Sequence, residues 1–301
     1  MLTIILLPAC LVAGVILRKT GRCPENTPEA LNGFIIHISL PALALYHIHS
    51  IVLTRDLVYT GLMAWVLFSL GVFFFYYAGK KFNLSRPTIG ALMLLGGIGN
   101  TSFVGLPMIK AYYGSQWIGV GIVADLVGSF FVLSTLGIVV ANMSTAGRVS
   151  LHYITKRILT FPPLLALVTA FFLKPVDFPE WLNFILSELG GTLTPLALVS
   201  VGFQLQLGYL KEEHLSLTLG LIFKLILGPA LVTLIYAGLL GGRGMTLQIT
   251  LFEAAMGPMI SAGIVAADYK LNPPLVSLML GVGIPLSFLT LPVWNFLLSG
   301  I

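Results

Sequence analysis

The chain has 301 residues, of which 57% are hydrophobic and 9% charged, and its formal net charge is +5. Its mean hydropathy is +0.99, whereas soluble domains are about 25% charged, so the composition excludes a soluble globular domain and indicates an integral membrane protein. In such a protein Lys and Arg report orientation in the bilayer, and the net charge gives no reason to expect a nucleic-acid partner.

Ten apolar runs approach the roughly 20 residues that a helix needs to cross the hydrocarbon core. In chain order they cover 2–18, 29–48, 57–78, 87–113, 117–141, 158–173, 182–207, 215–239, 246–267 and 274–298. No basic stretch precedes the first run and no small-residue cleavage signal follows it, so we expect a retained span there and no signal peptide. The sequence therefore predicts an all-α integral membrane protein of ten transmembrane helices.

The basic residues between the runs fall mainly on one side of the predicted bundle. That side carries Arg18, Lys19, Arg22, Lys80, Lys81, Arg86, Arg148, Lys156, Arg157, Lys211 and Lys270. The other side carries Arg55, Lys110, Lys174 and Arg243. Because cytoplasmic loops hold the excess of Lys and Arg, we expect a cell (inner) membrane protein whose two termini face outward, into the periplasm.

The second half of the chain repeats features of the first. The second run opens with PEALN at Pro28–Asn32, and the seventh opens with PEWLN at Pro179–Asn183. This match places runs one to five (1–145) over runs six to ten (146–301) in a single membrane domain. Because five is odd, the second copy would enter the membrane from the opposite side, and such inverted repeats are typical of alternating-access secondary transporters. A chance match between apolar segments is the alternative.

Runs four and nine are both interrupted by residues that disfavour a helix. The fourth contains GGIGNTSFVGLP at Gly96–Pro107, and the ninth contains EAAMGPMISAG at Glu253–Gly263. Broken helices free backbone groups that persist in a membrane only where they line a cavity or bind something, and helix N-termini favour anions. Paired interruptions therefore predict crossing broken helices and a transporter's binding site, unless the glycines only allow close helix packing. The candidate substrate-binding residues are Gly99, Asn100, Thr101, Ser102, Pro107, Gly257, Pro258, Met259 and Ser261.

Four ionisable residues lie inside the runs, where a charge is costly and functional by default. Glu253 precedes the ninth-run break and is interpreted as a proton acceptor or sodium ligand, or as a structural carboxylate bonded to freed N–H groups. Asp125 either titrates as a second coupling group or accepts hydrogen bonds from a neighbouring break. Lys224 either snorkels to the interface or is the counter-charge of a buried carboxylate or of the cargo. Glu188 is the fourth, and His47, at the outer end of the second run, is expected to be solvated.

The stretch GNTSFVGLPMIKAYYG, Gly99–Gly114, resembles the fourth-span signature of the auxin efflux carrier family, which includes plant PIN exporters and bacterial malonate permeases. The resemblance covers essentially the whole chain, which lacks the long cytoplasmic loop of many plant members. It implies a crossover of two discontinuous helices, a scaffold-like and a more mobile bundle, and a small carboxylate as cargo. It also implies that Asn100 faces the cargo and that Pro107 is the crossover proline. Plant members have a proline where this chain has Ala262. The related bile acid sodium symporters have a sodium-binding glutamate in a context similar to Glu253.

The predicted function is secondary active transport of small organic anions, either malonate-like dicarboxylates or auxin-like aromatic acids, by symport with H+ or Na+. No other cofactor is expected. A facilitative uniporter of organic acids and a sodium-coupled carrier like the bile acid symporters are the alternatives. The sequence has no HExxH or GxSxG motif and no clustered His or Cys ligands, so neither an enzyme nor a metal site is expected. The expected partners are the anion and the lipid bilayer, and the outer spans would permit a homodimer. The cargo, the direction of transport, the coupling ion and the oligomeric state stay open.

Overall fold

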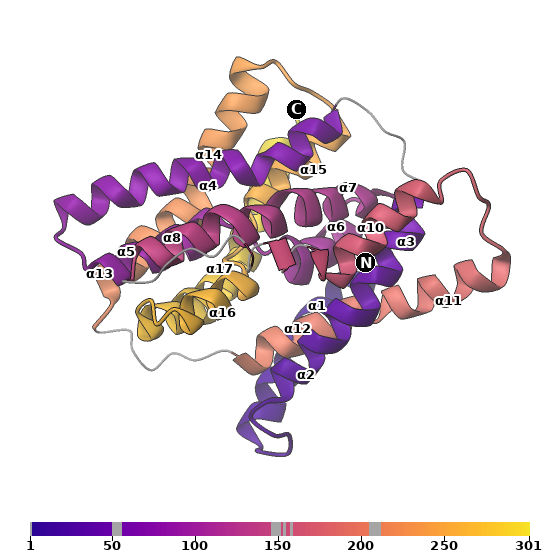
Figure 1. Ribbon diagram of the computed structural model, residues 1–301, viewed down its shortest axis with the longest axis horizontal. Coiled ribbons are helices and arrows are strands. Elements are labelled where there is room, and N and C mark those ends of the chain that lie inside the picture. Colours follow the sequence, from indigo (N-terminus) through magenta and orange to yellow (C-terminus); the bar gives the residue numbers. More distant parts are fainter. Residues whose placement is uncertain (1, 50–55, 146–151, 153–154, 157–158, 205–211) are drawn as a thin grey trace.

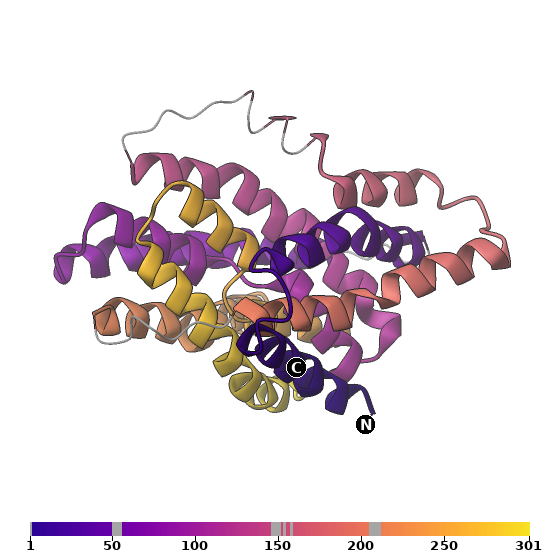
Figure 2. The same cartoon turned by 90° about the horizontal axis from the view of Figure 1, so that it is seen from below.

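The computed structural model describes residues 2–49, 56–145, 152, 155–156, 159–204 and 212–301. In this part all regular secondary structure is helical, and the only β-type pairing is one isolated bridge between Gly99 and Pro258. Most helices run along the long axis of the molecule, with α10 and α11 together at one end (Figures 1 and 2). The predicted all-helical class is confirmed. The loop residues Arg55, Arg148, Arg157 and Lys211, and the start of the second predicted repeat at 146, lie outside the described residues.

The elements of the first half run from the N-terminus to the loop before residue 146. They are α1 (Leu2–Lys19), α2 (Thr27–Phe34), η1 (Ile35–Ser39), α3 (Leu40–His49), α4 (Asp56–Lys81), α5 (Arg86–Gly97), η2 (Thr101–Gly105), α6 (Leu106–Tyr112), η3 (Ser115–Trp117), α7 (Ile118–Val123), η4 (Ala124–Phe130), η5 (Leu133–Gly137) and α8 (Ile138–Met143). The η segments are π-helical turns, apart from the 3-10 turn η3.

The second half has a similar series. Its elements are α10 (Pro162–Phe172), α11 (Glu180–Gly191), α12 (Leu193–Gln204), α13 (His214–Ile222), η6 (Phe223–Leu227), α14 (Gly228–Thr233), η7 (Leu234–Leu239), α15 (Met245–Ala254), α16 (Ile260–Asp268) and α17 (Pro273–Leu298). Pro occupies the first turn of α10 and α17, where its missing N–H costs no hydrogen bond.

Within the described residues, six uninterrupted helical stretches are long and apolar enough to cross a membrane. They are Thr27–Ile48, Asp56–Lys81, Ser115–Met143, Glu180–Phe203, His214–Leu239 and Pro273–Leu298. The predicted runs 87–113 and 246–267 are instead each divided into two shorter helices, α5 with α6 and α15 with α16. The first predicted run corresponds to the 18-residue α1 and the sixth to the 11-residue α10. The chain is thus a multi-pass membrane protein.

The helices pack as two groups. The flank bundle consists of α1, α2, η1, α3, α10, α11 and α12, in which α1 packs along α12 and α10 packs along α3. The crossing bundle consists of α4–α8 and α13–α17 with the η segments between them, and α4 packs there against α5, η4 and α15. The two bundles meet where α12 contacts η2 and where α3 contacts α7. Figure 1 shows the flank bundle beside the crossing bundle, with α5 and α6 following one another across the middle.

Candidate functional site: the crossing of two interrupted helices

The two interruptions predicted in runs four and nine meet in the structure. After α5, Ile98 is extended at φ −120° and ψ 130°, and Met259 before α16 is extended at φ −75° and ψ 127°. The backbone N–H of Asn100 donates to the carbonyl of Gly257 at 2.9 Å, and Gly99 pairs with Pro258 in the antiparallel bridge. Each interruption therefore satisfies part of the other's free backbone, as an irregular segment inside a membrane protein requires.

Glycines make this close approach possible. A Cβ on Gly99 would lie 3.3 Å from the Glu253 carbonyl oxygen and 3.3 Å from Nζ of Lys224. A Cβ on Gly257 would lie 3.0 Å from Oγ of Ser287 and 3.2 Å from a backbone carbonyl of α17. A backbone carbonyl crowds each position, and a backbone group cannot move aside as a flexible side chain can. The interruption glycines thus bring two chain segments together, in addition to breaking the helices.

Asn100 combines a cap with an open donor. Its Oδ1 accepts a hydrogen bond from the backbone N–H of Phe103 at 3.2 Å, which caps the N-terminus of η2. Its Nδ2 is buried and has no hydrogen-bond partner among the described residues. Leaving a buried donor unpaired costs about 1–3 kcal/mol. The amide is therefore a vacant hydrogen-bond donor beside a helix N-terminus, which is suitable for an anionic oxygen.

The next two residues face a carboxylate. Thr101 donates from Oγ1 to Oδ1 of Asp125 at 2.6 Å, and Ser102 is a second hydroxyl beside the same carboxyl group. Asp125 lies on η4 and is buried. The structure thus gives Asp125 one of its two expected roles, as an acceptor from the neighbouring break. It also shows that the Thr101 hydroxyl is already engaged.

Glu253, at the end of α15, is 0% exposed, and neither of its carboxyl oxygens has a hydrogen-bond partner among the described residues. The freed N–H groups of the break therefore do not hold this carboxylate, in contrast to the structural role considered for it. Two glycines make space for the group. A Cβ on Gly105 would clash with both carboxyl oxygens, and one on Gly121 would lie 3.3 Å from Oε1. A buried carboxylate without donors is strongly unfavourable unless it takes up a proton or a cation.

Lys224, on η6, is fully buried. Its Nζ donates to the carbonyl of Ala254 at 3.1 Å and so caps the last turn of α15, where a positive charge is favourable. The alternative that Lys224 snorkels to the interface is wrong. Glu253 is close enough to interact electrostatically with both Lys224 and Asp125. Two carboxyl groups and one ammonium group therefore share the crossing.

The other predicted residues lie around this centre. Pro107 is buried in the first turn of α6, and Pro258 packs against Gly283 of α17. Met259 occupies the N-cap position of α16 without a side-chain hydrogen bond, and Ser261 follows, half-buried, in the first turn. Glu188 is exposed on α11.

Three contributors to the crossing were not predicted, namely Gly121 on α7, Gly283 and Ser287 on α17. They lie in spans without an interruption, and no local sequence signal marks them. Only the fold brings a glycine of α7 against the Glu253 carboxyl group, or a turn of α17 against Gly257.

Interrupted helices that cross inside a bundle of membrane-spanning helices, with buried ionisable groups at the crossing, define a membrane transporter. The comparison with known families agrees with this class. The chain belongs to the membrane transport protein family, whose model matches residues 1–295. This is the auxin efflux carrier type of membrane transporter, so the predicted family is confirmed.

Two curated relatives extend over nearly the whole chain. An uncharacterized transporter of Methanothermobacter thermautotrophicus is 26% identical over 304 residues, covering 98% of this chain and 97% of its own length. An uncharacterized transporter of Methanocaldococcus jannaschii is 25% identical over 287 residues, covering 92% of both chains. The family and both relatives are named as transporters, in agreement with the prediction that this chain is not an enzyme.

Proposed function

We propose that the protein is a secondary active transporter of small organic anions that works by alternating access and carries a proton or a sodium ion with its cargo. The observation that supports this most is the combination, at one crossing, of the vacant donor of Asn100 with the unpaired carboxyl group of Glu253. The first group suits an anion and the second suits a cation. Both groups belong to the crossing, so one site would hold both ions.

Two inverted five-span repeats, 1–145 and 146–301, are the architecture that we propose for this site. The first helix of each half packs on the second span of the other, α1 on α12 and α10 on α3. The third span is a 26-residue helix in the first half, and its counterpart His214–Leu239 also has 26 residues. The fourth span of each half is interrupted. This exchange of partners is what two copies related by a two-fold axis in the membrane plane would produce.

The cargo anion would bind on the N-terminal side of the two inner half-helices. Both η2 and α16 begin at the crossing, and their first backbone N–H groups have no partners within their own helices. Apart from the N–H of Phe103, which the Asn100 Oδ1 already caps, these groups and Nδ2 of Asn100 would form a donor set for a carboxylate. The hydroxyl of Thr101 orients Asp125 in this scheme and does not contact the cargo.

Charge balance favours coupled transport over facilitated diffusion. If both carboxyl groups and Lys224 are charged, the crossing carries one net negative charge, which repels an anion. One proton or one sodium ion at Glu253 removes that charge, so cation uptake makes the site competent for the cargo. Cation and anion would then move in the same direction, as symport requires.

The proposed protein lies in the inner membrane with both termini in the periplasm, and lipid covers the exposed apolar residues of α4, α14 and α17. A homodimer within the bilayer is compatible with these surfaces.

Transport into liposomes tests the cargo site. Purified protein should take up labelled malonate or an aromatic acid saturably, and more strongly under an inward proton or sodium gradient. Asn100→Ala removes the vacant donor and should lower kcat/KM at least about tenfold, the effect of losing one hydrogen bond to a charged group.

Asn183→Ala on α11 is the matched control. Within the described part of the chain, the Asn183 amide donates to the nearby carbonyl of Phe178 and contributes nothing to the crossing, so this variant should transport normally. If Asn100→Ala transports as well as the control, the crossing is not the cargo site. If wild-type uptake is the same with and without each gradient, the protein is a facilitative uniporter.

A further inference from the structure

A polar cavity lies between the two bundles, separate from the site proposed at the crossing. It has a volume of about 200 Å³ and is lined by α3, α6, η3, α7, α11 and the start of α12. Its position follows from chain direction: α6 continues from η2, and Lys110 comes ten residues after Asn100, about 15 Å further along a helix. The helices α5 and α16 pack together on one side of the crossing. The cavity lies on the opposite side, toward which α6 runs.

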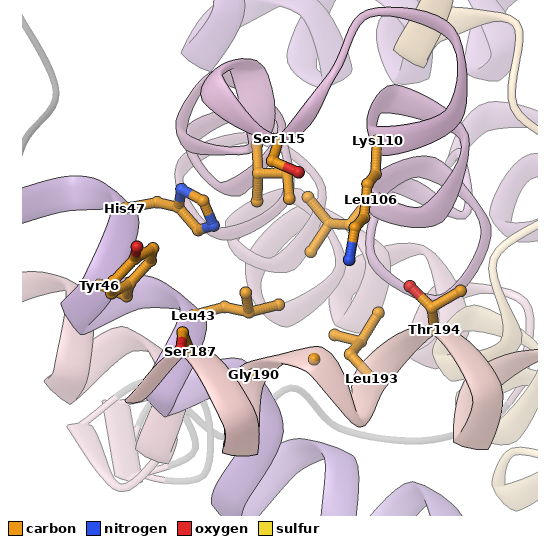
Figure 3. Close-up of a pocket in the computed structure, with 12 residues that line it drawn as sticks. Leu43, Tyr46, His47, Leu106, Lys110, Ser115, Ser187, Gly190, Leu193 and Thr194 are labelled. Carbon is orange, nitrogen blue, oxygen red and sulfur yellow. The ribbon is translucent and has the colours of Figure 1, made fainter. Parts of the chain in front are cut away.

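The polar lining of the cavity is basic or neutral. Lys110 extends along α6 and turns its ammonium group into the space between Leu106 and Thr194, while His47 points in from α3 (Figure 3). His47 and Lys110 are close enough to interact electrostatically. Ser115 and Tyr46 add two hydroxyl groups, and no acidic side chain is among the described residues that line the cavity. A half-buried ammonium that lines a cavity without a carboxylate is a site for an anion.

The rest of the lining is apolar. Leu43, Leu106, Ile118 and Leu193 cover the space between the polar groups. A fully hydrated inorganic ion gains nothing from such walls, whereas a carboxylate with a short hydrocarbon body buries that body against them. The lining also comes from both bundles: Lys110 and Ser115 belong to the crossing bundle, and His47 and Thr194 belong to the flank bundle.

We propose that this cavity is a second binding site, for the carboxylate of a small organic acid, in which Lys110 provides the charge and His47, Tyr46 and Thr194 provide hydrogen bonds. The anion would occupy it before entering the crossing or after leaving it. This inference rests on the proposed function for the identity of the ligand as cargo. Occupancy of the site, however, is tested by equilibrium binding, which does not depend on transport.

Equilibrium binding of labelled malonate and labelled benzoate to purified protein tests the site. We expect Asn100→Ala to retain a binding site that the double variant Asn100→Ala, Lys110→Met lacks. In liposomes, Lys110→Met alone should raise KM about tenfold, as expected for losing a charged hydrogen bond, while the maximal rate stays within a factor of about two. Lys110→Arg should restore most of the affinity, since it keeps the charge.

Lys174→Met is the matched control, because Lys174 is a half-buried lysine that does not line this cavity, and it should leave binding and KM unchanged. Equal binding by the single and double variants would overturn the second site and leave the proposed transport intact. Loss of transport in the wild type together with Lys110-dependent binding would contradict the proposed function and leave the site intact. Competition by inorganic phosphate as strong as that by malonate would show a general anion site and overturn the assignment to organic acids.

Discussion

Glu253 is a carboxyl group that the fold isolates from every donor described around it. Gly105 and Gly121 lie beside the group and have no side chain to donate a hydrogen bond to it. Its charge state therefore depends on what enters the site. Under the proposed function, cation binding and anion binding would influence one another at this residue, since each would relieve the electrostatic cost of the other.

Glu253→Gln tests this coupling. The variant removes one negative charge, so the crossing becomes neutral without a bound cation. We expect malonate exchange between the two faces of the membrane to persist, while accumulation driven by a proton or sodium gradient falls to the level without a gradient. Uptake measured with and without each imposed gradient provides the comparison.

Glu188→Gln on α11 is the control, because this glutamate is exposed and lies outside the crossing. It should keep the full response to the gradient. Unchanged gradient dependence in Glu253→Gln would remove Glu253 from the coupling step.

At the scale of residues, the sequence predicted which groups are unusual better than it predicted what they contact. Asn100 and Glu253 stand out because polar residues beside helix breakers are rare in an apolar run. The partner of Thr101 is Asp125, and the partner of Lys224 is the Ala254 carbonyl. Both pairs join different spans, so only the tertiary structure could reveal them. Lys110 was counted as a loop charge and His47 as a solvated residue, yet both are half-buried in one cavity.

At the scale of elements, small residues decide how closely helices approach. Gly14 of α1 and Gly202 of α12 face each other: a Cβ on Gly202 would clash with the carbonyl oxygen of Leu11, and one on Gly14 would clash with that of Val199. The obstacle in both cases is helix backbone, which cannot move aside like a side chain. This is the packing of small residues that membrane helices use where lipid and protein are equally apolar.

Gly202→Ala should therefore separate α1 from α12. Overpacking of a tight contact costs about 1–3 kcal/mol, so we expect a lower melting temperature in detergent than the wild type shows. Scanning fluorimetry or fluorescence-detected gel filtration after heating provides the measurement.

Gly33→Ala on α2 is the matched control, because a Cβ there meets no atom within 4 Å. It should be neutral or slightly stabilising, since alanine favours the helix. Equal melting temperatures for the two variants would show that the α1–α12 contact tolerates a wider spacing.

Helix positions were predictable because a membrane imposes a minimum length on apolar segments. The existence of the two interruptions was also predictable, from glycine and proline. Their pairing was expected, but the atoms that join them were not. The many π-helical turns, such as η4 around Asp125 and η6 around Lys224, had no recognisable sequence signal, because they depend on packing more than on local propensity.

At the scale of the whole molecule, a larger cavity of about 750 Å³ lies between the ends of α1 and α12 and the helices α16 and α17. It is on the α16 side of the crossing, opposite the cavity around Lys110. Both cavities lie between the flank bundle and the crossing bundle. In the proposed mechanism, a relative movement of the two bundles would widen one cavity and close the other, as alternating access requires.

Cys23 lines the larger cavity and is half-buried, whereas the other cysteine, Cys10, is buried in α1. A membrane-impermeant maleimide should therefore label wild-type protein in inside-out vesicles and not in intact cells, if the proposed orientation is right. Saturating cargo under a gradient should change the labelling rate at least about twofold, as the populations of the two states shift.

Cys23→Ala is the control and should abolish labelling. Labelling in intact cells would reverse the proposed orientation of the protein in the membrane, and a rate insensitive to cargo would contradict bundle movement at this cavity.

The hydrogen bond from Asn100 to Gly257 also bears on how the protein is made. During synthesis α5 and α6 are made long before α15 and α16. We therefore expect the backbone groups of the first interruption to lack these partners until the second half is made, at a cost of several kcal/mol for each group exposed to lipid. We therefore expect the nascent first half to keep these backbone groups in contact with water or with another protein. Completion of the crossing would end that need.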